Sequence, residues 1–374
     1  MRVLHFVTGG FSGATQVAVD LCLAGKKIPG TEVMLVLRRK RNTDAQRVQA
    51  LRDKGLTVHI VSNWLHALTV WELRKLMQEW KPDVVFAHGF SDHIWGRRAA
   101  VAAKVPHIFH VEHNARERYT PRRLRQALEL SPWTQAHIGV SEGVKERLIE
   151  LGFPAEKCVA IPNGIDLQKF PASLLPVQWS AREPALLMAS RFARQKDHET
   201  LINALYVLRQ RGIVPQVYLA GSGSARLRQK VQQQVAKLGL SEQVVFLGNV
   251  SDLPQRLAHV QICVLSTHWE GMPLALVEGM AAGCACIASH VVGAKEVFRD
   301  GVEGMIVPHA DAQALAQAIQ ELLADQARAQ ALGQAARNRA LSSYGLEHMW
   351  HQYAQLMLGG ADCEGAAKEG VVFY

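Results

Sequence analysis

The stretch "ICVLSTHWEGMPLALVEGMAAGCACIAS", residues 262–289, decides the fold. It begins with a short apolar run, passes through a loop with glycine and proline, continues as an apolar helical pattern and ends on a second apolar run. Two strand-like runs joined through one helix predict a strand–helix–strand unit with parallel strands. The stretch also holds two carboxylates, Glu270 before the helix and Glu278 inside it.

The same alternation extends in both directions from this stretch. Strand-like runs such as "RVLHFVT", "DVVFAH", "PALLMAS" and "QVYLAGSG" are separated by amphipathic stretches of helical period. This rhythm predicts an α/β fold with mainly parallel sheets and helices on both faces. The rhythm stops at "NGIDLQKFPASLLPVQWSAREP", which has three prolines and little periodicity, and then restarts.

A chain of 374 residues is too long for one typical core, so we expect two domains. The aperiodic segment predicts a linker over residues 166–184. An N-terminal domain then spans residues 1–165 and a C-terminal domain spans residues 185–345. We expect residues 346–374 to form a C-terminal helix that returns to the N-terminal domain, followed by a tail.

Composition limits the class of partner. The net charge of +9 and the isoelectric point near 9.3 favour anionic partners: nucleic acid, anionic lipid or phosphorylated substrates. Basic residues are scattered and match no nucleic-acid-binding motif, so we expect no nucleic acid partner; a non-enzymatic, basic nucleic-acid-binding protein stays a remote alternative. The start "MRVLHFVTGG" lacks a signal-peptide core and no long apolar run follows, so we expect a cytoplasmic protein.

Four turns follow strand-like runs, where open α/β sheets bind ligands. They are "TGGFSGAT" (8–15), "SRFARQKDH" (190–198), "LAGSGSARLRQ" (219–229) and "FLGNVSDLPQRL" (246–257). Glycine lets the backbone approach a ligand, and a helix N-terminus offers N–H groups to phosphate. Arg191 and Lys196 would offset the charge of a diphosphate. Each turn, taken alone, also fits a simple chain reversal or a solvated basic turn.

The two glutamates of the opening stretch need partners. Pro273 suits the first turn of the helix, and the N–H groups of Gly271, Met272 and Leu274 suit a phosphate at the positive helix end. Glu278, inside an apolar helix, requires hydrogen-bond donors or an opposite charge. Sugar hydroxyls and a structural salt bridge remain equal alternatives on spacing alone.

Taken together, these motifs resemble the glycosyltransferase family 4 pattern. The E-x7-E spacing of the two glutamates is its most specific part, and "VSEGVKERL", "IPNGIDLQKF" and "GVEGMIVPHADAQALAQAIQELL" add to it in the same order. The resemblance is strong over residues 137–345 and looser over residues 1–136. It implies a GT-B fold, two Rossmann-like domains facing a central cleft. It also implies sugar transfer from a nucleotide-diphosphate sugar with retention at the anomeric carbon, without metal or cofactor.

The resemblance assigns residues to roles. Arg191 and Lys196 would bind the diphosphate, Glu270 the hydroxyls of the donor sugar and Glu278 the ribose. Both His110 and His113 are candidates for the family histidine, and His113 fits the strand end better. The implied catalytic residues are His113, Arg191, Lys196 and Glu270. The implied nucleotide-sugar-binding residues are Gly10, Gly13, Gly221, Gly223, Gly248, Asn249, Val250, Gly271, Met272, Pro273, Leu274 and Glu278.

The chain departs from the family pattern at two loops. The loop "GGFSGAT" is longer than in many members, which bears on the acceptor side, where we also expect His88. Asp197 takes the place of a glycine after Lys196, so we expect a ligand to approach the protein backbone less closely at this position. Neither change removes a charged group.

The acceptor is suggested by "ARERYTPRRLRQALEL", residues 115–130, with five arginines between Arg116 and Arg125. A basic amphipathic helix of this kind contacts an anionic membrane or is simply solvated. With the membrane reading, we expect a saccharide or lipid-linked acceptor in bacterial lipopolysaccharide or cell-surface polysaccharide assembly, a UDP-sugar donor, and a location on the inner face of the cytoplasmic membrane. A nucleotide-sugar 2-epimerase of the same fold is the alternative.

Overall fold

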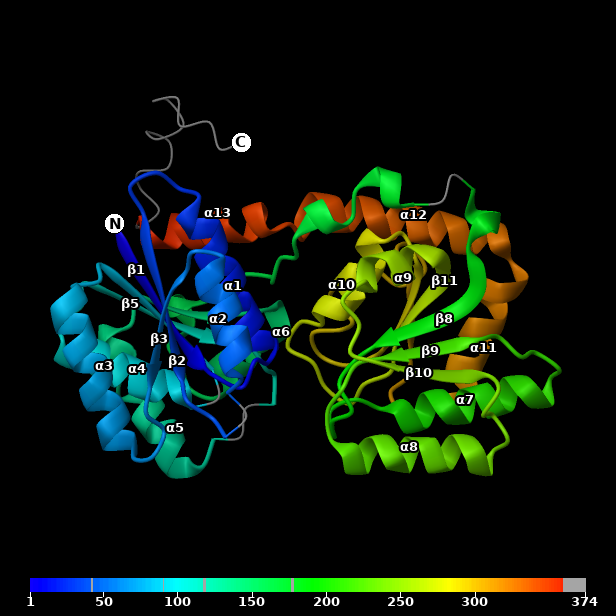
Figure 1. The fold of residues 1–374 in the computed structure, drawn as a ribbon, viewed down its shortest axis with the longest axis horizontal. Coiled ribbons are helices and arrows are strands. Elements are labelled where there is room, and N and C mark those ends of the chain that lie inside the picture. Colours follow the sequence, from blue (N-terminus) through cyan, green and yellow to red (C-terminus); the bar gives the residue numbers. More distant parts are fainter. Residues whose placement is uncertain (42, 90, 117–118, 176–177, 359–374) are drawn as a thin grey trace. The chain divides into compact units, whose positions relative to one another are not determined.

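The computed structural model describes residues 1–41, 43–89, 91–116, 119–175 and 178–358. The chain divides into two compact units: unit 1 is Met1–Gly164 together with the segment from Leu346, and unit 2 is Ile165–Gly345 (Figure 1). The segment expected to be a linker opens unit 2 as three short 3₁₀ turns, Leu167–Lys169, Ala172–Leu174 and Trp179–Ala181. The expected tail, residues 360–374, lies outside the described residues.

Unit 1 alternates strands and helices along the chain. Its strands are β1 (Arg2–Thr8), β2 (Glu32–Arg38), β3 (Thr57–Val61), β4 (Val84–His88), β5 (His107–Glu112), β6 (Ala136–Gly139) and β7 (Cys158–Ala160). Its helices are α1 (Gly13–Lys26), α2 (Ala45–Asp53), α3 (His66–Trp80), α4 (Asp92–Ala102), α5 (Pro121–Leu128), α6 (Glu142–Glu150) and α13 (Leu346–Met357).

The strands of unit 1 form one parallel sheet in the order β3-β2-β1-β4-β5-β6-β7. Leu4, Phe6 and Val85 face a core cluster shared with helices α3, α4 and α5, whereas Val7 and Leu35 face a second cluster shared with α1 and α2. Buried apolar side chains on both faces explain why the strand runs are continuously hydrophobic. The C-terminal helix α13 packs against α1 of the same unit.

Unit 2 repeats the pattern. Its strands are β8 (Glu183–Ala189), β9 (Val217–Ala220), β10 (Val244–Gly248), β11 (Val260–Leu265), β12 (Ala285–Ser289) and β13 (Met305–Val307). Its helices are α7 (His198–Gln210), α8 (Ala225–Lys237), α9 (Leu253–His259), α10 (Leu274–Ala281), α11 (Ala312–Ala324) and α12 (Gln326–Ser343).

The sheet of unit 2 is parallel with the order β10-β9-β8-β11-β12-β13. The order reverses direction between β8 and β11, since β9 and β10 extend to one side and β12 and β13 to the other. Such a reversal is the position at which open α/β sheets bind ligands. Helices α7, α8 and α11 lie together on one face and α9, α10 and α12 on the other (Figure 1).

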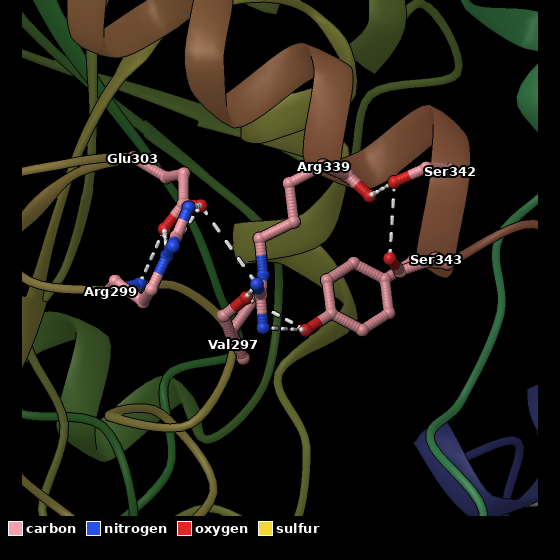
Figure 2. A network of polar contacts seen from close by, with 7 residues as sticks. Val297, Arg299, Glu303, Arg339, Ser342 and Ser343 are labelled. Carbon is pink, nitrogen blue, oxygen red and sulfur yellow. Dashed lines mark hydrogen bonds and ion pairs between the residues drawn. The ribbon is translucent and has the colours of Figure 1, made fainter.

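A polar network anchors the end of α12 to the loop before β13 (Figure 2). Arg339 Nε donates to Val297 O at 2.9 Å, and Tyr344 Oη donates to the same carbonyl at 2.8 Å. Glu303 accepts from Arg299 Nε at 2.9 Å, and Arg299 holds the pKa of the Glu303 carboxyl below its usual value. The network fixes the exit of the chain from unit 2 beside its entry, where Ile165 N donates to Tyr344 O at 2.8 Å.

Five buried histidines and the half-buried His113 line the two faces of the unit 1 sheet. On the α1 face, His88 Nε2 lies 3.1 Å from His5 Nδ1, and His88 Nδ1 lies 2.9 Å from His113 Nε2. On the α4 face, His110 stacks on His93 and its Nδ1 lies 3.1 Å from Nδ1 of His137. Burial lowers the pKa of His5 and His113 to about 3 and of His137 to about 2, and it lowers the other three pKa values well below 6.5. The folded unit therefore keeps all six imidazoles neutral.

None of the helices in the described residues has both the length and the apolar character needed to cross a bilayer.

The histidine array predicts acid lability of unit 1. In the unfolded chain these imidazoles protonate near pH 6.5, whereas in the fold they stay neutral to far lower pH, so stability is complete above pH 6.5 and falls as pH decreases. Each such histidine lowers the free energy of unfolding by about 1 kcal/mol between pH 6.5 and pH 5.5. Urea titrations at pH 7.5, 6.5 and 5.5 measure this loss.

His5→Asn removes one of the titrating groups and should flatten the dependence of unfolding free energy on pH. The control is His59→Asn, because His59 is an exposed histidine of the same unit. Equal pH slopes in the wild-type protein and the His5 variant would contradict the assignment.

Candidate active site

A buried ion pair joins the loops that follow β8 and β11. Lys196 Nζ lies 2.5 Å from Glu270 Oε1, and the two side chains are 11% and 6% exposed. The carboxylate also accepts from Thr267 Oγ1 at 2.7 Å and from Gln195 Nε2 at 2.9 Å. These extra donors offset the cost of taking a carboxylate out of water, so that the attraction between the two charges holds the loops together.

The backbones of the same two loops are also paired. Asp197 N donates to Ser266 O at 3.0 Å and His268 N donates to Gln195 O at 2.8 Å, on either side of an antiparallel bridge between Lys196 and Thr267. The bridge is possible because β8 and β11 are neighbours in the sheet. It presents Lys196 and Glu270 at the reversal point of the strand order.

The helix α10 begins directly after this loop. The sequence predicts Pro273 in its first turn; in the structure Pro273 is the N-cap, with φ −82° and ψ 99°, and Leu274 is the first helical residue. Gly271 and Met272 are buried beside it. Gly293, at φ +79°, packs so closely on Gly271 O that a Cβ there would overlap it. The positive end of α10 is therefore held next to the buried ion pair.

Glu278 lies in the second turn of α10 and is partly exposed. The sequence left its partner open between a ligand and a salt bridge. The structure shows a buried ion pair on Glu270, and its lysine is the one expected to bind a diphosphate. The two groups that were assigned to different parts of a ligand thus contact each other.

One glycine turn, after β9, packs against the loop after β8. Gly221 has φ +134° and Gly223 has φ +145°, and a Cβ on either would overlap the carbonyl oxygen of Ser190 or Phe192. Phe192 N donates to Ser222 O at 2.8 Å, and Gly221 N donates to Gly248 O at 2.6 Å. Only glycine tolerates this backbone conformation at such close approach. The turn at Gly248, Asn249 and Val250 therefore adjoins the turn after β9.

A cavity of about 930 Å³ opens beside these turns. Arg191 and Gly223, both expected from the sequence, line it. Three further cations, Arg194, Arg226 and Lys230, also line it and were not expected. The cavity suits an anion, because five of its lining groups are either positively charged side chains or a glycine backbone that a ligand can approach.

Unit 1 contains the remaining expected residues. Gly10 lies in the loop after β1 and Gly13 is the first residue of α1, behind the N-cap Ser12. His113 directly follows β5 and is bound to His88, the last residue of β4. The sequence treated His113 and His88 as separate candidates for donor and acceptor contacts, whereas the structure joins them in one chain with His5. His110 faces the α4 side with His137.

Sequence reasoning missed Gln195 and Thr267, which complete the shell around the Glu270 carboxylate. A usable signal was present, because each lies close in sequence to an expected residue: Gln195 precedes Lys196, and Thr267 is three residues before Glu270. A side chain next to a buried charge is a natural donor to it.

Two family models match consecutive parts of the chain. The model described as Glycosyltransferase Family 4 matches residues 11–169, and the model described as Glycosyl transferases group 1 matches residues 176–339. Together they span most of both units.

Two curated proteins illustrate the similarity. The chain is 27% identical over 250 residues to a UDP-Gal:alpha-D-GlcNAc-diphosphoundecaprenol alpha-1,3-galactosyltransferase of Escherichia coli. This alignment covers 63% of the chain and 65% of that relative. It is 25% identical to the lipopolysaccharide core biosynthesis glycosyltransferase LpsE of Rhizobium meliloti, over 96% of the chain and 99% of the relative. The chain thus spans just under two thirds of the first relative and nearly all of the second.

Solved structures agree on the fold. The structure of HepE from Anabaena in complex with UDP and glucose superposes with a TM-score of 0.82 at 21% identity, covering 96% of the chain and 100% of that protein. A sucrose-phosphate synthase from Thermosynechococcus elongatus gives a TM-score of 0.80 at 22% identity, covering 96% of the chain and 98% of that protein. The two parallel Rossmann-like sheets are those of GT-B glycosyltransferases, and the chain belongs to glycosyltransferase family 4, the group 1 glycosyl transferases.

Proposed function

We propose that the protein transfers a sugar from a nucleotide-diphosphate sugar, a UDP-sugar, to a saccharide or lipid-linked acceptor with retention at the anomeric carbon. The observation that carries the proposal is the buried Lys196–Glu270 pair beside the N-terminus of α10, at the reversal point of the unit 2 sheet. The positively charged cavity beside the loop after β8, lined by Arg191 and Gly223, gives room for a nucleotide diphosphate.

The diphosphate is the leaving group in this mechanism. Negative charge develops on it as the glycosidic bond breaks, and Arg191, Lys196 and the positive end of α10 stabilise that charge. These groups do the electrostatic work that a metal ion does in other transferases, so we propose that the chemical step needs no metal. The leaving phosphate then assists deprotonation of the acceptor hydroxyl on the same face of the sugar.

The two glutamates hold the donor in this proposal. Glu270 accepts hydrogen bonds from hydroxyls of the donor sugar and Glu278 from the ribose, whereas His113 donates to the donor sugar. A retaining hydrolase would instead need two carboxylates about 5 Å apart that face the anomeric carbon. Glu270 has its oxygens bonded to Lys196, Thr267 and Gln195, which fits a positioned acceptor and not an exposed nucleophile.

The choice of UDP rests on similar proteins. HepE of Anabaena was solved in complex with UDP and glucose, and the Escherichia coli relative is named for UDP-Gal. A relative from Mycolicibacterium smegmatis, 28% identical over 61% of the chain, is named as GDP-mannose-dependent. A thermal-shift screen over UDP-, GDP- and ADP-sugars separates these donors, because a ligand that binds only the folded state raises the melting temperature.

We expect Arg191→Ala and Lys196→Met each to lower turnover by roughly 10²–10³, the usual effect of removing one donor that stabilises developing negative charge. Lys237→Ala, an exposed lysine at the end of α8, is the matched control. Sugar transfer is measured by release of the nucleoside diphosphate in the presence of the acceptor. Near-normal turnover in both variants would rule out this assignment, and product formation without acceptor would favour an epimerase.

Measurements of unfolding free energy separate a catalytic role of the Lys196–Glu270 pair from a purely structural one. Lys196→Met leaves Glu270 buried without its cation and should cost about 3–5 kcal/mol of unfolding free energy. The double variant Lys196→Met/Glu270→Gln removes both charges and should recover most of that stability without recovering turnover. Recovery of turnover together with stability would show that the pair has only a structural role.

We propose that the acceptor is lipid-linked and that transfer takes place at the cytoplasmic face of a membrane. Arg122, Arg123 and Arg125 of α5 are exposed, whereas Leu124 and Leu128 pack into the core of unit 1. The apolar side of α5 is therefore used within the fold, and only its charge is available to a lipid surface. Arg118, one of the five arginines expected to contribute, lies outside the described residues.

The positive charge of α5 lies next to further basic residues in the loop after β2. Burial, followed by the nearby charges of Arg38, Arg123 and Lys40, lowers the pKa of His66, so α5 and the loop after β2 lie close together. That loop lines a cavity of about 570 Å³ with Arg39, Lys40 and Arg41. Trp64, from the loop after β3, lines the same cavity, and it is 85% exposed. An exposed indole beside arginines is typical of contact with a lipid headgroup region.

Removing charge from α5 should weaken binding to vesicles that contain anionic lipid. Near a charged membrane each basic residue contributes about 1 kcal/mol, so Arg122→Gln/Arg123→Gln/Arg125→Gln should weaken binding roughly a hundredfold, and salt should do the same to the wild-type protein. The control is Lys145→Gln/Arg147→Gln, since Glu142 and Glu150 already compensate those charges. No flotation of the wild-type protein at low salt would contradict the proposal.

A further inference from the structure

Three potential metal ligands meet beside the buried ion pair of unit 2. One ligand atom each of Asp197, His268 and His309 lies within 4.8 Å of the other two. His268 Nδ1 is 2.8 Å from His309 Nε2 and 3.8 Å from Asp197 Oδ2. Ligands bound to zinc at the usual 2.0–2.2 Å in a tetrahedron are about 3.3 Å apart, which falls between these two distances.

The Asp197 carboxylate is held in place for such a role. Its Oδ1 accepts from Thr200 N at 3.1 Å and caps α7. Its Oδ2 is buried and makes no hydrogen bond in the described residues, and the whole residue is only 4% exposed. A buried carboxylate oxygen without a donor is costly, and a cation is the partner that would satisfy it.

The two imidazoles also need a partner between them. Two ring nitrogens 2.8 Å apart cannot both present lone pairs to each other, so either a proton or a cation lies between them. The backbone bridge that pairs Lys196 with Thr267 fixes Asp197 and His268 on neighbouring loops. His309 comes from the loop after β13 and is exposed, so the cluster is open to solvent on that side.

We propose that Asp197, His268 and His309 bind a zinc-like divalent cation. Two imidazoles and one carboxylate suit a borderline metal such as Zn²⁺, whereas Mg²⁺ and Ca²⁺ prefer oxygen ligands. The cation bridges the loops after β8, β11 and β13 and so stabilises the segments that hold Lys196 and Glu270. Its role is structural: none of its ligands is among the residues proposed to contact the donor, and the chemical step does not pass through it.

The test measures metal binding directly. Protein freed of its affinity tag is stripped with chelator, titrated with ZnCl₂ by calorimetry and assayed for bound zinc after gel filtration. We expect about one Zn²⁺ per chain and a higher melting temperature on binding. His309→Ala should bind at least roughly tenfold more weakly and lose the thermal shift.

Two further variants exclude trivial explanations. His290→Ala changes another exposed histidine of unit 2 and should bind zinc as the wild-type protein does. Asp197→Asn keeps a side-chain oxygen to cap α7 but removes the charge, so it should fold and bind zinc more weakly. The five described cysteines are buried thiols and are the same in every variant. Absence of zinc binding in the wild-type protein, or equal binding by His309→Ala, would overturn the proposal and would leave a hydrogen bond between the two imidazoles as the explanation of their contact.

Discussion

The contact between Lys196 and Glu270 is the interaction on which the candidate site depends. It is buried, it joins side chains 74 residues apart, and it fixes the loop after β8 to the loop after β11. With Thr267 and Gln195 as further donors, the carboxylate cannot turn away without losing several bonds at once. The same constraint sets the start of α10 and the positions of Asp197 and His268, so recognition and stability share one set of contacts.

Glycine extends this constraint across the sheet. At Gly221, Gly223 and Gly293 the backbone of one strand-end loop touches the backbone of another with no room for a side chain. The loops after β8, β9, β11 and β12 are therefore packed by their main chains, and their side chains stay free to contact a ligand. A scaffold of this kind tolerates changes of pocket side chains, which is consistent with the range of donor names among the relatives.

Local patterns predicted the strands, the glycine turns and the strand–loop–helix unit from Ile262 onward, because each depends on neighbouring residues. They could not predict which distant loops meet. The Lys196–Glu270 pair, the His5–His88–His113 chain and the Asp197–His268–His309 cluster follow from the order of strands in each sheet, and a single sequence does not show that order. The sequence likewise could not show whether the apolar side of α5 packs into the protein core or faces a membrane; its packing shows that it joins the core.

The helix α13 determines the order in which the two units can complete folding during synthesis. Tyr353 of α13 is fully buried and meets Phe86 at 5.2 Å, on the face where Phe86 also stacks on His5. A ribosome releases this helix only after the whole of unit 2 has emerged, although domains otherwise fold from the N-terminus as they are made. The nascent chain can therefore complete its second unit first, and the face of the first unit that Tyr353 covers stays exposed to water until α13 has left the ribosome.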